Sequence, residues 1–241
     1  MDMSQFKPYH KDKFSVGTSI AVIGRSMSGK STLVENMLSN FDRNFSIPLK
    51  HCKIFILLHK AMQPSYNRLM GLFPSTTRKI LARSVDKEWL EPSWFLSHYT
   101  SEQDFALILY DDQMEELARK KSAELELLSS LMWVGLHHSR CILVVTLQSL
   151  GTSETSSQLR VLLKNFSVFV LMSGLTAPTV RYLSSFLSPG KSGLLVGLMA
   201  ALPRRPGAYL VVDDRYTAPH RFSAQSILCS QPNGQIYMVF E

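Results

Sequence analysis

Cysteine is scarce in this sequence, and no two cysteines have the spacing of a paired motif. The 241 residues include only Cys52, Cys141 and Cys229, with no C-x-x-C among them. An odd number at wide spacing argues against a disulfide framework and against a zinc site. Cys52 and Cys141 lie in apolar, strand-like runs, so we expect them to be small core residues. This usage predicts a reducing compartment, cytosol or nucleus.

Long hydrophobic runs are also missing. The longest, residues 193–202, ends at Pro203 and falls short of the ~18 apolar residues that a membrane-spanning helix needs. Residues 1–13 are polar and basic and lack the apolar centre of a secretory signal. We therefore expect no membrane partner. There is no internal repeat and no low-complexity tract.

Acidic residues are fewer than basic residues in this sequence. Nineteen Asp and Glu residues stand against 26 Lys and Arg residues, which gives a net charge of +7. A basic balance leans towards a polyanionic partner such as nucleic acid, because phosphate contacts favour basic surfaces. Hydrophobic residues make up 45% of the chain, enough to fill a sizeable core.

Residues 24–32 form a phosphate-binding loop by sequence. They read G-R-S-M-S-G-K-S-T and match G-x-x-x-x-G-K-[ST] in full. The apolar residues 20–23 before them predict a buried strand, and residues 33–38 after them predict a helix. We expect Lys30 to reach the β- and γ-phosphates of ATP, and Ser31 to bind Mg²⁺. The residues expected to contact the nucleotide are Gly24, Arg25, Ser26, Met27, Ser28, Gly29, Lys30, Ser31 and Thr32.

Apolar runs alternate with helical patterns along the rest of the chain. Alternation of this kind predicts an α/β fold with a mostly parallel sheet, flanked by helices and wound right-handed. The expected strands are residues 18–23, 53–58, 105–110, 140–146 and 166–172, and the expected helices are 33–39, 114–133 and 179–187. In the second helix, Leu125, Leu128 and Leu131 are expected to face the core and Glu124 the solvent. Residues 74–104 predict loops and short helices over one sheet edge, and residues 208–212 and 221–228 predict a terminal hairpin.

The expected organisation is a RecA-like P-loop NTPase domain with this C-terminal β-hairpin extension. We assign a basic lead-in to residues 1–16, a single ATPase domain to residues 17–230, and a tail to residues 231–241.

Polar residues follow two of the predicted strands at their carboxyl ends, where such sheets bind ligands. Asp111 and Asp112 end the strand at residues 105–110, and Gln148 ends the next strand. Asp111 is expected to hold Mg²⁺. Asp112 is expected to orient and polarise the attacking water, and it also suits the cap of the following helix. Gln148 is expected to sense the γ-phosphate or the water, the alternative being a solvated loop residue.

The order of these parts favours ATPases over GTPases and nucleotide kinases. An apolar strand, residues 53–58, separates the phosphate loop from the Asp111 strand in the chain, and no Asn-Lys-x-Asp motif for guanine is present. ATPase rings often supply an arginine from a neighbouring subunit to the reaction. Arg160 is our first candidate for this role, Arg25 could act in cis, and Arg119 is the weakest choice.

Two other patterns in the sequence resemble binding motifs but do not predict a phosphate or metal site. Gly190, Lys191 and Ser192 repeat the end of the phosphate-loop motif, but Ser185 stands where the first glycine is needed and no strand precedes it. The adjacent His137-His138 pair has no third ligand at a suitable spacing for a metal.

Taken together, the motifs resemble the genome-packaging ATPases of double-stranded DNA viruses, in the poxvirus-like and Polinton/adintovirus-like branch of the FtsK–HerA superfamily. The resemblance covers residues 17–215. The residues that carry it are residues 24–32, Gln63, Pro64, Ser65, Tyr66, residues 107–112, His137, His138, Gln148, Arg160 and Asn165. The sequence departs from the usual pattern at Asp112, where many members have Glu, and at Arg25 and Met27, where small residues or Pro are more usual.

The resemblance implies an ATP- and Mg²⁺-dependent motor that drives double-stranded viral DNA into a preformed capsid. It implies a homo-oligomeric ring at the capsid or portal vertex, working in the host nucleus or cytoplasm at the site of virion assembly, with association with the virion as an alternative. Candidate DNA contacts are Lys164, Lys191, Arg204 and Arg205. Three alternatives stay open: a cellular or plasmid DNA translocase or helicase of the same superfamily, a nucleotide-binding scaffold without turnover, and a small-molecule phosphotransferase.

Overall fold

A single nine-stranded sheet forms the centre of the molecule, in the order β3-β2-β4-β5-β1-β6-β7-β8-β9. The computed structural model describes residues 13–58, 71, 73, 79–82, 92–111, 123–138, 140–148, 157–187, 192–202, 206–213, 222–224 and 237–238. Strands β3 to β6 in this order pair in parallel, and β7, β8 and β9 continue the sheet in antiparallel pairs. The strands are β1 (Ser19–Ile23), β2 (Cys52–Leu58), β3 (Lys79–Ala82), β4 (Phe105–Asp111), β5 (Cys141–Leu147), β6 (Val168–Met172), β7 (Tyr209–Asp213), β8 (Phe222–Ala224) and β9 (Tyr237–Met238).

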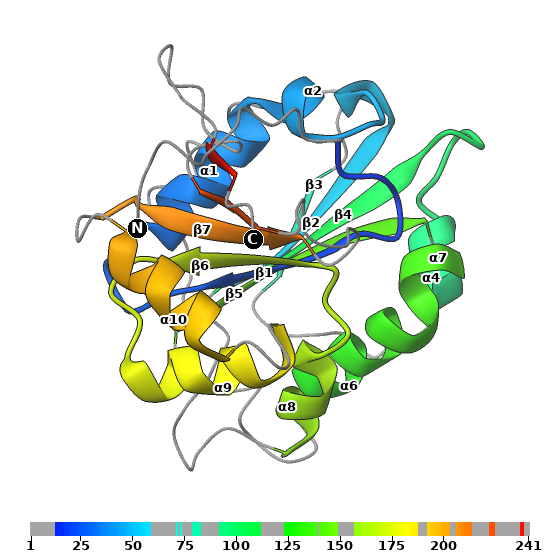
Figure 1. Ribbon diagram of the computed structural model, residues 1–241. Coiled ribbons are helices and arrows are strands. Elements are labelled where there is room, and N and C mark those ends of the chain that lie inside the picture. Colours follow the sequence, from blue (N-terminus) through cyan, green and yellow to red (C-terminus); the bar gives the residue numbers. More distant parts are fainter. Residues whose placement is uncertain are drawn as a thin grey trace.

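Helices cover both faces of this sheet (Figure 1). On one face lie α1 (Lys30–Ser39) and α2 (Phe41–Asn44), with the short η2 (Leu49–His51) leading into β2. The other face is covered by α4 (Pro92–Leu96), α6 (Ala123–Ser130), the π-helical η4 (Leu131–Gly135), α7 (Leu136–His138), α8 (Ser157–Leu163), α9 (Ala177–Leu187) and α10 (Ser192–Ala201). The α/β fold predicted from the alternating pattern is confirmed.

The central strands consist mainly of apolar residues because both of their faces are buried. In β1, Ile20 and Val22 pack in the core beneath α1, whereas Ala21 and Ile23 pack in the core beneath α6 to α10. Successive side chains of a strand point to opposite faces, so a strand covered on both sides needs an apolar residue at every position. For this reason the continuous apolar runs in the sequence predicted the central strands.

Two expectations about residues 74–138 are wrong. Residues 79–82 form the edge strand β3, paired in parallel with β2, where only loops and short helices were expected. The helix predicted over about residues 114–133 is described from Ala123 and continues through η4 and α7, so that the His137-His138 pair lies at its end. Glu124, expected to face the solvent, is 7% exposed, because the Tyr110 hydroxyl donates to the Glu124 carbonyl at 3.1 Å and draws the start of α6 against β4.

The C-terminal hairpin is present and belongs to the main sheet. β7 pairs with β6, β8 pairs with β7, and β9 lies within the segment assigned to the tail. The domain boundaries themselves stay a prediction. In the described part of the chain, no helix combines the length and the apolar character needed to cross a membrane.

The two described cysteines are core residues, as expected. Cys52 and Cys141 are fully buried and free. Burial raises the pKa of the Cys141 thiol to about 12 and that of Cys52 still further above its usual range. Thiols with raised pKa values are poor nucleophiles, so neither cysteine is suited to catalysis.

Candidate phosphate-binding site

The phosphate loop, Gln148 and Asp111 lie near one another at the carboxyl ends of the parallel strands because of the strand order. β1, which leads into the phosphate loop, lies between β5 and β6, and β5 in turn separates β1 from β4. Gln148, directly after β5, therefore lies between the loop and Asp111 at the end of β4. The strand that separates the loop from Asp111 in space is β5, whereas residues 53–58 separate them only along the chain.

Two glycines shape the loop for different reasons. A Cβ atom on Gly24 would lie 2.5 Å from the Ser28 Oγ and 2.6 Å from the Met172 Cγ, so the loop packs too closely here for any side chain. Gly29 has a φ of 93°, a left-handed conformation that glycine adopts without steric cost. It directly precedes the first residue of α1. The loop thus rests on the end of β6 and turns sharply into the helix.

Met27 adopts a strained conformation at the exposed side of the loop. Its φ is 61°, which costs a non-glycine residue roughly 1–2 kcal/mol. Its side chain is 94% exposed, so core packing does not offset this cost. The unusual residue noted in the sequence is therefore strained and solvent-facing in the structure.

Lys30 is buried, with its ammonium folded back onto the loop. Its Nζ donates to the Gly24 carbonyl at 2.9 Å and to the Arg25 carbonyl at 3.0 Å, and the residue is 8% exposed. These carbonyl dipoles stabilise a charge whose burial would otherwise be costly. Because Lys30 begins α1, its positive charge adds to that of a helix N-terminus. The loop therefore offers an anion site, which fits the phosphates of a nucleotide.

Ser28 contributes a polar atom that lacks a partner. Among the described residues, its Oγ is the buried side-chain oxygen or nitrogen without a hydrogen bond. Leaving such a group without a hydrogen bond costs roughly 1–3 kcal/mol. The loop in this conformation is therefore destabilised at Ser28.

Gln148 lies beside the phosphate loop. The Ser26 hydroxyl donates to the Gln148 Oε1 at 3.3 Å, across the gap between the ends of β1 and β5. The side chain of Gln148 is partly exposed. This contact places the expected sensor next to the position where phosphates would bind.

Asp111 is held by a neighbour that the sequence analysis did not identify. Asp111 is 2% exposed, and the Thr146 hydroxyl donates to its Oδ1 at 2.6 Å. The register of β4 and β5 pairs Tyr110 with Val145, which brings the next residues, Asp111 and Thr146, together. Thr146 is the one polar residue in β5, two positions before Gln148, and this was the signal available in the sequence.

Arg160, on α8, lies against Tyr182 of α9. It is exposed on α8, with its guanidinium carbon 5.8 Å from the centre of the Tyr182 ring. The Tyr182 hydroxyl also donates to the Arg160 carbonyl at 3.3 Å. Arg25, the candidate for a role in cis, is exposed on the loop itself.

The remaining predicted residues are only partly described. Ser31 is half-buried and Thr32 is exposed in the first turn of α1. Lys164 and His138 are exposed, and the Asn165 amide donates to the Val161 carbonyl at 3.1 Å. The following lie outside the described residues: Gln63, Pro64, Ser65, Tyr66, Asp112, Arg119, Lys191, Arg204, Arg205 and Cys229.

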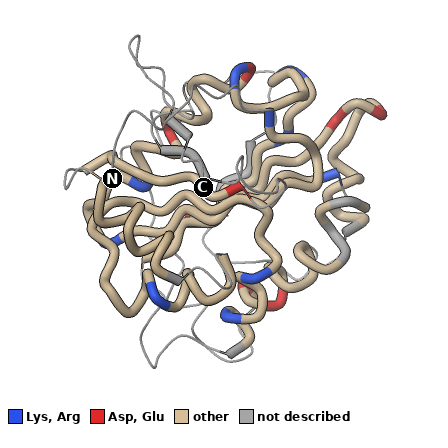
Figure 2. The backbone as a smooth tube through the Cα atoms, in the orientation of Figure 1, with Lys and Arg blue, Asp and Glu red and all other residues tan. Residues whose placement is uncertain are grey.

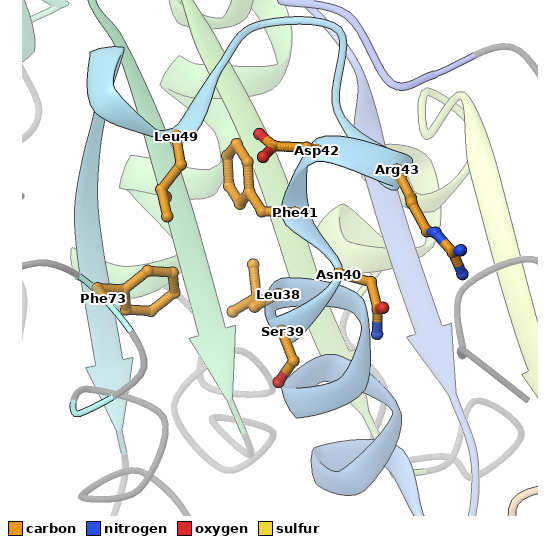
Figure 3. A pocket seen from close by; sticks show the side chains of 8 residues that line it. All are labelled: Leu38, Ser39, Asn40, Phe41, Asp42, Arg43, Leu49 and Phe73. Atoms are coloured by element: carbon orange, nitrogen blue, oxygen red, sulfur yellow. The ribbon is translucent and has the colours of Figure 1, made fainter.

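A hollow of about 270 Å³ lies at the other end of α1 (Figure 3). Its lining includes Leu38, Phe41, Arg43 and Leu49, where α1 and α2 meet the start of β2. The phosphate loop adjoins the first turn of α1, whereas this hollow adjoins the last. It is therefore separate from the candidate phosphate site.

The loop, the buried lysine and the inserted strand β5 together define a RecA-like P-loop NTPase fold. No protein-family model matches the chain, and no curated protein matches its sequence. Solved structures do share the fold. The genome-packaging NTPase B204 from Sulfolobus turreted icosahedral virus 2, in complex with AMP, is 12% identical with a TM-score of 0.59, over 87% of this chain and 96% of that one.

Two further structures have the same fold. B204 from Sulfolobus turreted icosahedral virus, a DNA-packaging ATPase, is 12% identical with a TM-score of 0.59, over 88% of this chain and 98% of that one. The cytoplasmic domain of EssC is 13% identical with a TM-score of 0.51, over 95% of this chain and 41% of that one. At these identities the likeness shows the fold.

Proposed function

We propose that the protein is an ATP-hydrolysing motor that moves double-stranded DNA, and that its cargo is a viral genome entering a preformed capsid. The observation that carries the ATPase part is the strand order. It places β5 and Gln148 between the phosphate loop and Asp111. The fold shared with the packaging NTPase B204, over nearly the whole length of both chains, supports the packaging role.

ATP would bind at the phosphate loop. Backbone N–H groups of the loop and the N-terminus of α1 would face the phosphates, and Lys30 would exchange its carbonyl contacts for phosphate oxygens. Structures of B204 in complex with AMP and with AMPPCP support a nucleotide as the ligand of this fold.

Ser31 and Asp111 would hold Mg²⁺. A hydroxyl and a buried carboxylate are oxygen ligands of the kind this ion prefers, and Thr146 fixes the carboxylate. The ion would neutralise charge on the β- and γ-phosphates. The hydrogen bond from Thr146 would hold this carboxylate in one orientation.

Hydrolysis would depend on Asp112 and Gln148. Asp112 follows directly after the metal ligand and would accept the proton of the attacking water. Gln148 would leave Ser26 and hydrogen-bond the water or the γ-phosphate. Arg160, from a neighbouring subunit, would neutralise charge in the transition state, with Arg25 in cis as the alternative.

The motor would act as a homo-oligomeric ring around DNA, at the capsid or portal vertex, in the nucleus or cytoplasm of a host cell. The net charge of +7 supports a polyanionic partner. Figure 2 shows the described Lys and Arg residues spread over several elements. A cellular translocase of the same superfamily is the second candidate, and the fold shared with the EssC cytoplasmic domain favours it.

The experiment that tests this proposal is an ATPase assay with and without duplex DNA, over a range of salt concentrations. We expect DNA to stimulate hydrolysis and the stimulation to fall with salt, because phosphate contacts release counterions. A particle-size measurement on the same samples should show a species larger than one chain. A nucleotide-binding scaffold would bind ATP without turnover, and a phosphotransferase would be insensitive to DNA. Either result would overturn the proposal.

A further inference from the structure

Residues 206–208, the described part of the α10–β7 turn, lie directly on the phosphate loop. The Gly207 N–H donates to the Ser28 carbonyl at 3.0 Å. The next residue, Ala208, accepts a hydrogen bond from the Ser173 N–H at 2.8 Å, just after β6. The turn is thus bonded to the phosphate loop on one side and to the end of β6 on the other. Both of these hydrogen bonds join backbone atoms.

The bond to Ser28 fixes the direction of one peptide group in the loop. The Ser28 carbonyl and the Gly29 N–H belong to the same planar trans peptide and point in opposite directions. When Gly207 holds the carbonyl, the Gly29 N–H is directed to the other side of the loop. Backbone N–H groups are the donors that a loop of this kind offers to a phosphate.

Gly29 and Gly207 matter for different reasons, the first for the close approach of the two segments and the second for its backbone angle. A Cβ atom on Gly29 would lie 3.2 Å from the Gly207 nitrogen and 3.5 Å from its Cα. Gly207 itself has a φ of 83°, the left-handed conformation that directs its N–H at the loop. A Cβ on Gly207 would meet nothing within 4 Å, so its backbone angle, and not its space, is what matters.

We propose that Gly207 is a positioning residue for the phosphate loop, and that the α10–β7 turn is part of the nucleotide site. Its N–H holds the Ser28–Gly29 peptide so that the Gly29 N–H is presented to a bound phosphate. A displacement of α10 or β7 then changes nucleotide affinity, which links the C-terminal strands to the nucleotide state. The inference rests on the proposed binding of a nucleotide at this loop.

The test compares proline substitutions in two neighbouring turns. Gly207→Pro removes the N–H and forces φ to about −65°. Gly174→Pro makes the same change after β6, where Gly174 has a φ of 79° and open space around it. Gly207→Asn keeps the N–H, and Asn tolerates the left-handed conformation. Calorimetric titration with ADP gives the affinity of each variant, and thermal unfolding gives its stability.

We expect Gly207→Pro to bind ADP about tenfold more weakly, as for the loss of one hydrogen bond to the site. Gly174→Pro and Gly207→Asn should bind as the wild-type chain does, even where they unfold at lower temperature. Wild-type affinity in Gly207→Pro, or an equal loss in Gly174→Pro, would overturn the inference. If the wild-type chain itself fails to bind ADP, the proposed function fails instead.

A second measurement on the wild-type chain covers the case in which Gly207→Pro does not fold. Hydrogen–deuterium exchange of a peptide that spans residues 206–208 should slow when ADP is added. A turn that merely packs beside the loop would exchange at the same rate with and without ADP, and that result would also overturn the inference.

Discussion

At the scale of single residues, we expect binding and turnover to depend on residues that follow two different strands, β1 and β4, which β5 separates in the sheet. Lys30 follows β1 in the loop, and Asp112 follows β4. A lysine that contacts the phosphates acts in binding as well as in the reaction. A carboxylate that polarises water acts only once the nucleotide is bound.

Substitutions at these two positions should therefore separate the two steps. Lys30→Ala should abolish ATP binding, because the phosphates lose their main cationic partner. Asp112→Asn should keep binding and lower kcat by about 10²–10⁴, the usual contribution of a general base. Equilibrium binding of a fluorescent ATP analogue and steady-state hydrolysis measure the two effects. Normal hydrolysis by Asp112→Asn would remove Asp112 from the mechanism.

The Thr146 hydroxyl gives the second residue-scale prediction. Thr146→Val keeps the shape of the side chain but leaves a buried Asp111 oxygen without its 2.6 Å hydrogen bond. We expect a loss of roughly 1–3 kcal/mol in the free energy of unfolding and a higher Mg²⁺ requirement for nucleotide binding. Denaturant unfolding and a Mg²⁺ titration of ADP binding measure these effects. Thr146→Ser restores the hydroxyl and should restore both values; equal Mg²⁺ requirements in the Val and Ser variants would contradict the positioning role.

The strand, loop and helix around residues 24–32 could be predicted from the sequence because the signal is local. The residues from 24 to 32, the strand before them and the helix after them are contiguous in the chain. Thr146 and Gly207 reach the site only through tertiary register. Thr146 depends on the pairing of β4 with β5, and Gly207 depends on the antiparallel return of β7 beside β6. Neither the pairing of β4 with β5 nor that of β6 with β7 can be read from a single sequence.

At the scale of elements, burial on both faces decided which strands could be predicted. β4 and β5 are buried at all seven positions and stood out as continuous apolar runs. β3 has four residues at the edge of the sheet, begins with Lys79, and lies among mixed sequence. An edge strand needs no two-sided apolar pattern, so its sequence resembles that of a loop.

An ionic cluster ties together the amino ends of β2 and β4, opposite the phosphate site. Asp104 contacts Lys53 at 3.1 Å and His51 at 3.2 Å, with side chains 10% and 18% exposed. Burial by itself would raise the pKa of Asp104, but hydrogen bonds from Thr100, Lys53 and Ser101 outweigh it and hold the pKa well below its usual range. The carboxylate is therefore more stable in the folded state than in the unfolded state.

This cluster predicts how stability depends on pH. A depressed pKa contributes stability above the unfolded value of about 3.9, and the contribution is lost as the pH falls below it. Asp104→Asn should lower the free energy of unfolding by roughly 2–3 kcal/mol at pH 7, and by less at pH 4 and below. Glu102→Gln, an exposed position in the same turn, is the matched control and should show neither effect. Denaturant unfolding at the two pH values tests this. A loss that does not depend on pH would rule out a charge effect.

At the scale of the whole molecule, the central question is whether a site needs a second copy of the chain. Arg160 is exposed on α8 and stacks on Tyr182, so it is presented from the molecular surface. Arg25 is exposed within the loop of its own subunit. A trans-acting arginine predicts complementation between defective subunits, whereas a cis-acting one does not.

Mixing two inactive variants distinguishes these cases. Lys30→Ala has a defective loop but an intact Arg160, and Arg160→Ala has the reverse. If Arg160 acts in trans, a mixed ring contains some sites with both groups, so the mixture should hydrolyse ATP faster than either variant alone. Arg25→Ala mixed with Lys30→Ala is the control, and it should show no recovery. If hydrolysis recovers only in that control, Arg160 is not the arginine that acts on the neighbouring subunit.

The most direct test of the motor is movement along duplex DNA. In a displacement assay, a third strand bound to the duplex is released when a translocating protein reaches it. We predict ATP-dependent release by the wild-type chain, and no release with ADP, with a non-hydrolysable ATP analogue, or by Lys30→Ala. ATP hydrolysis that DNA stimulates, but that never displaces the third strand, would contradict the conclusion that this protein moves DNA.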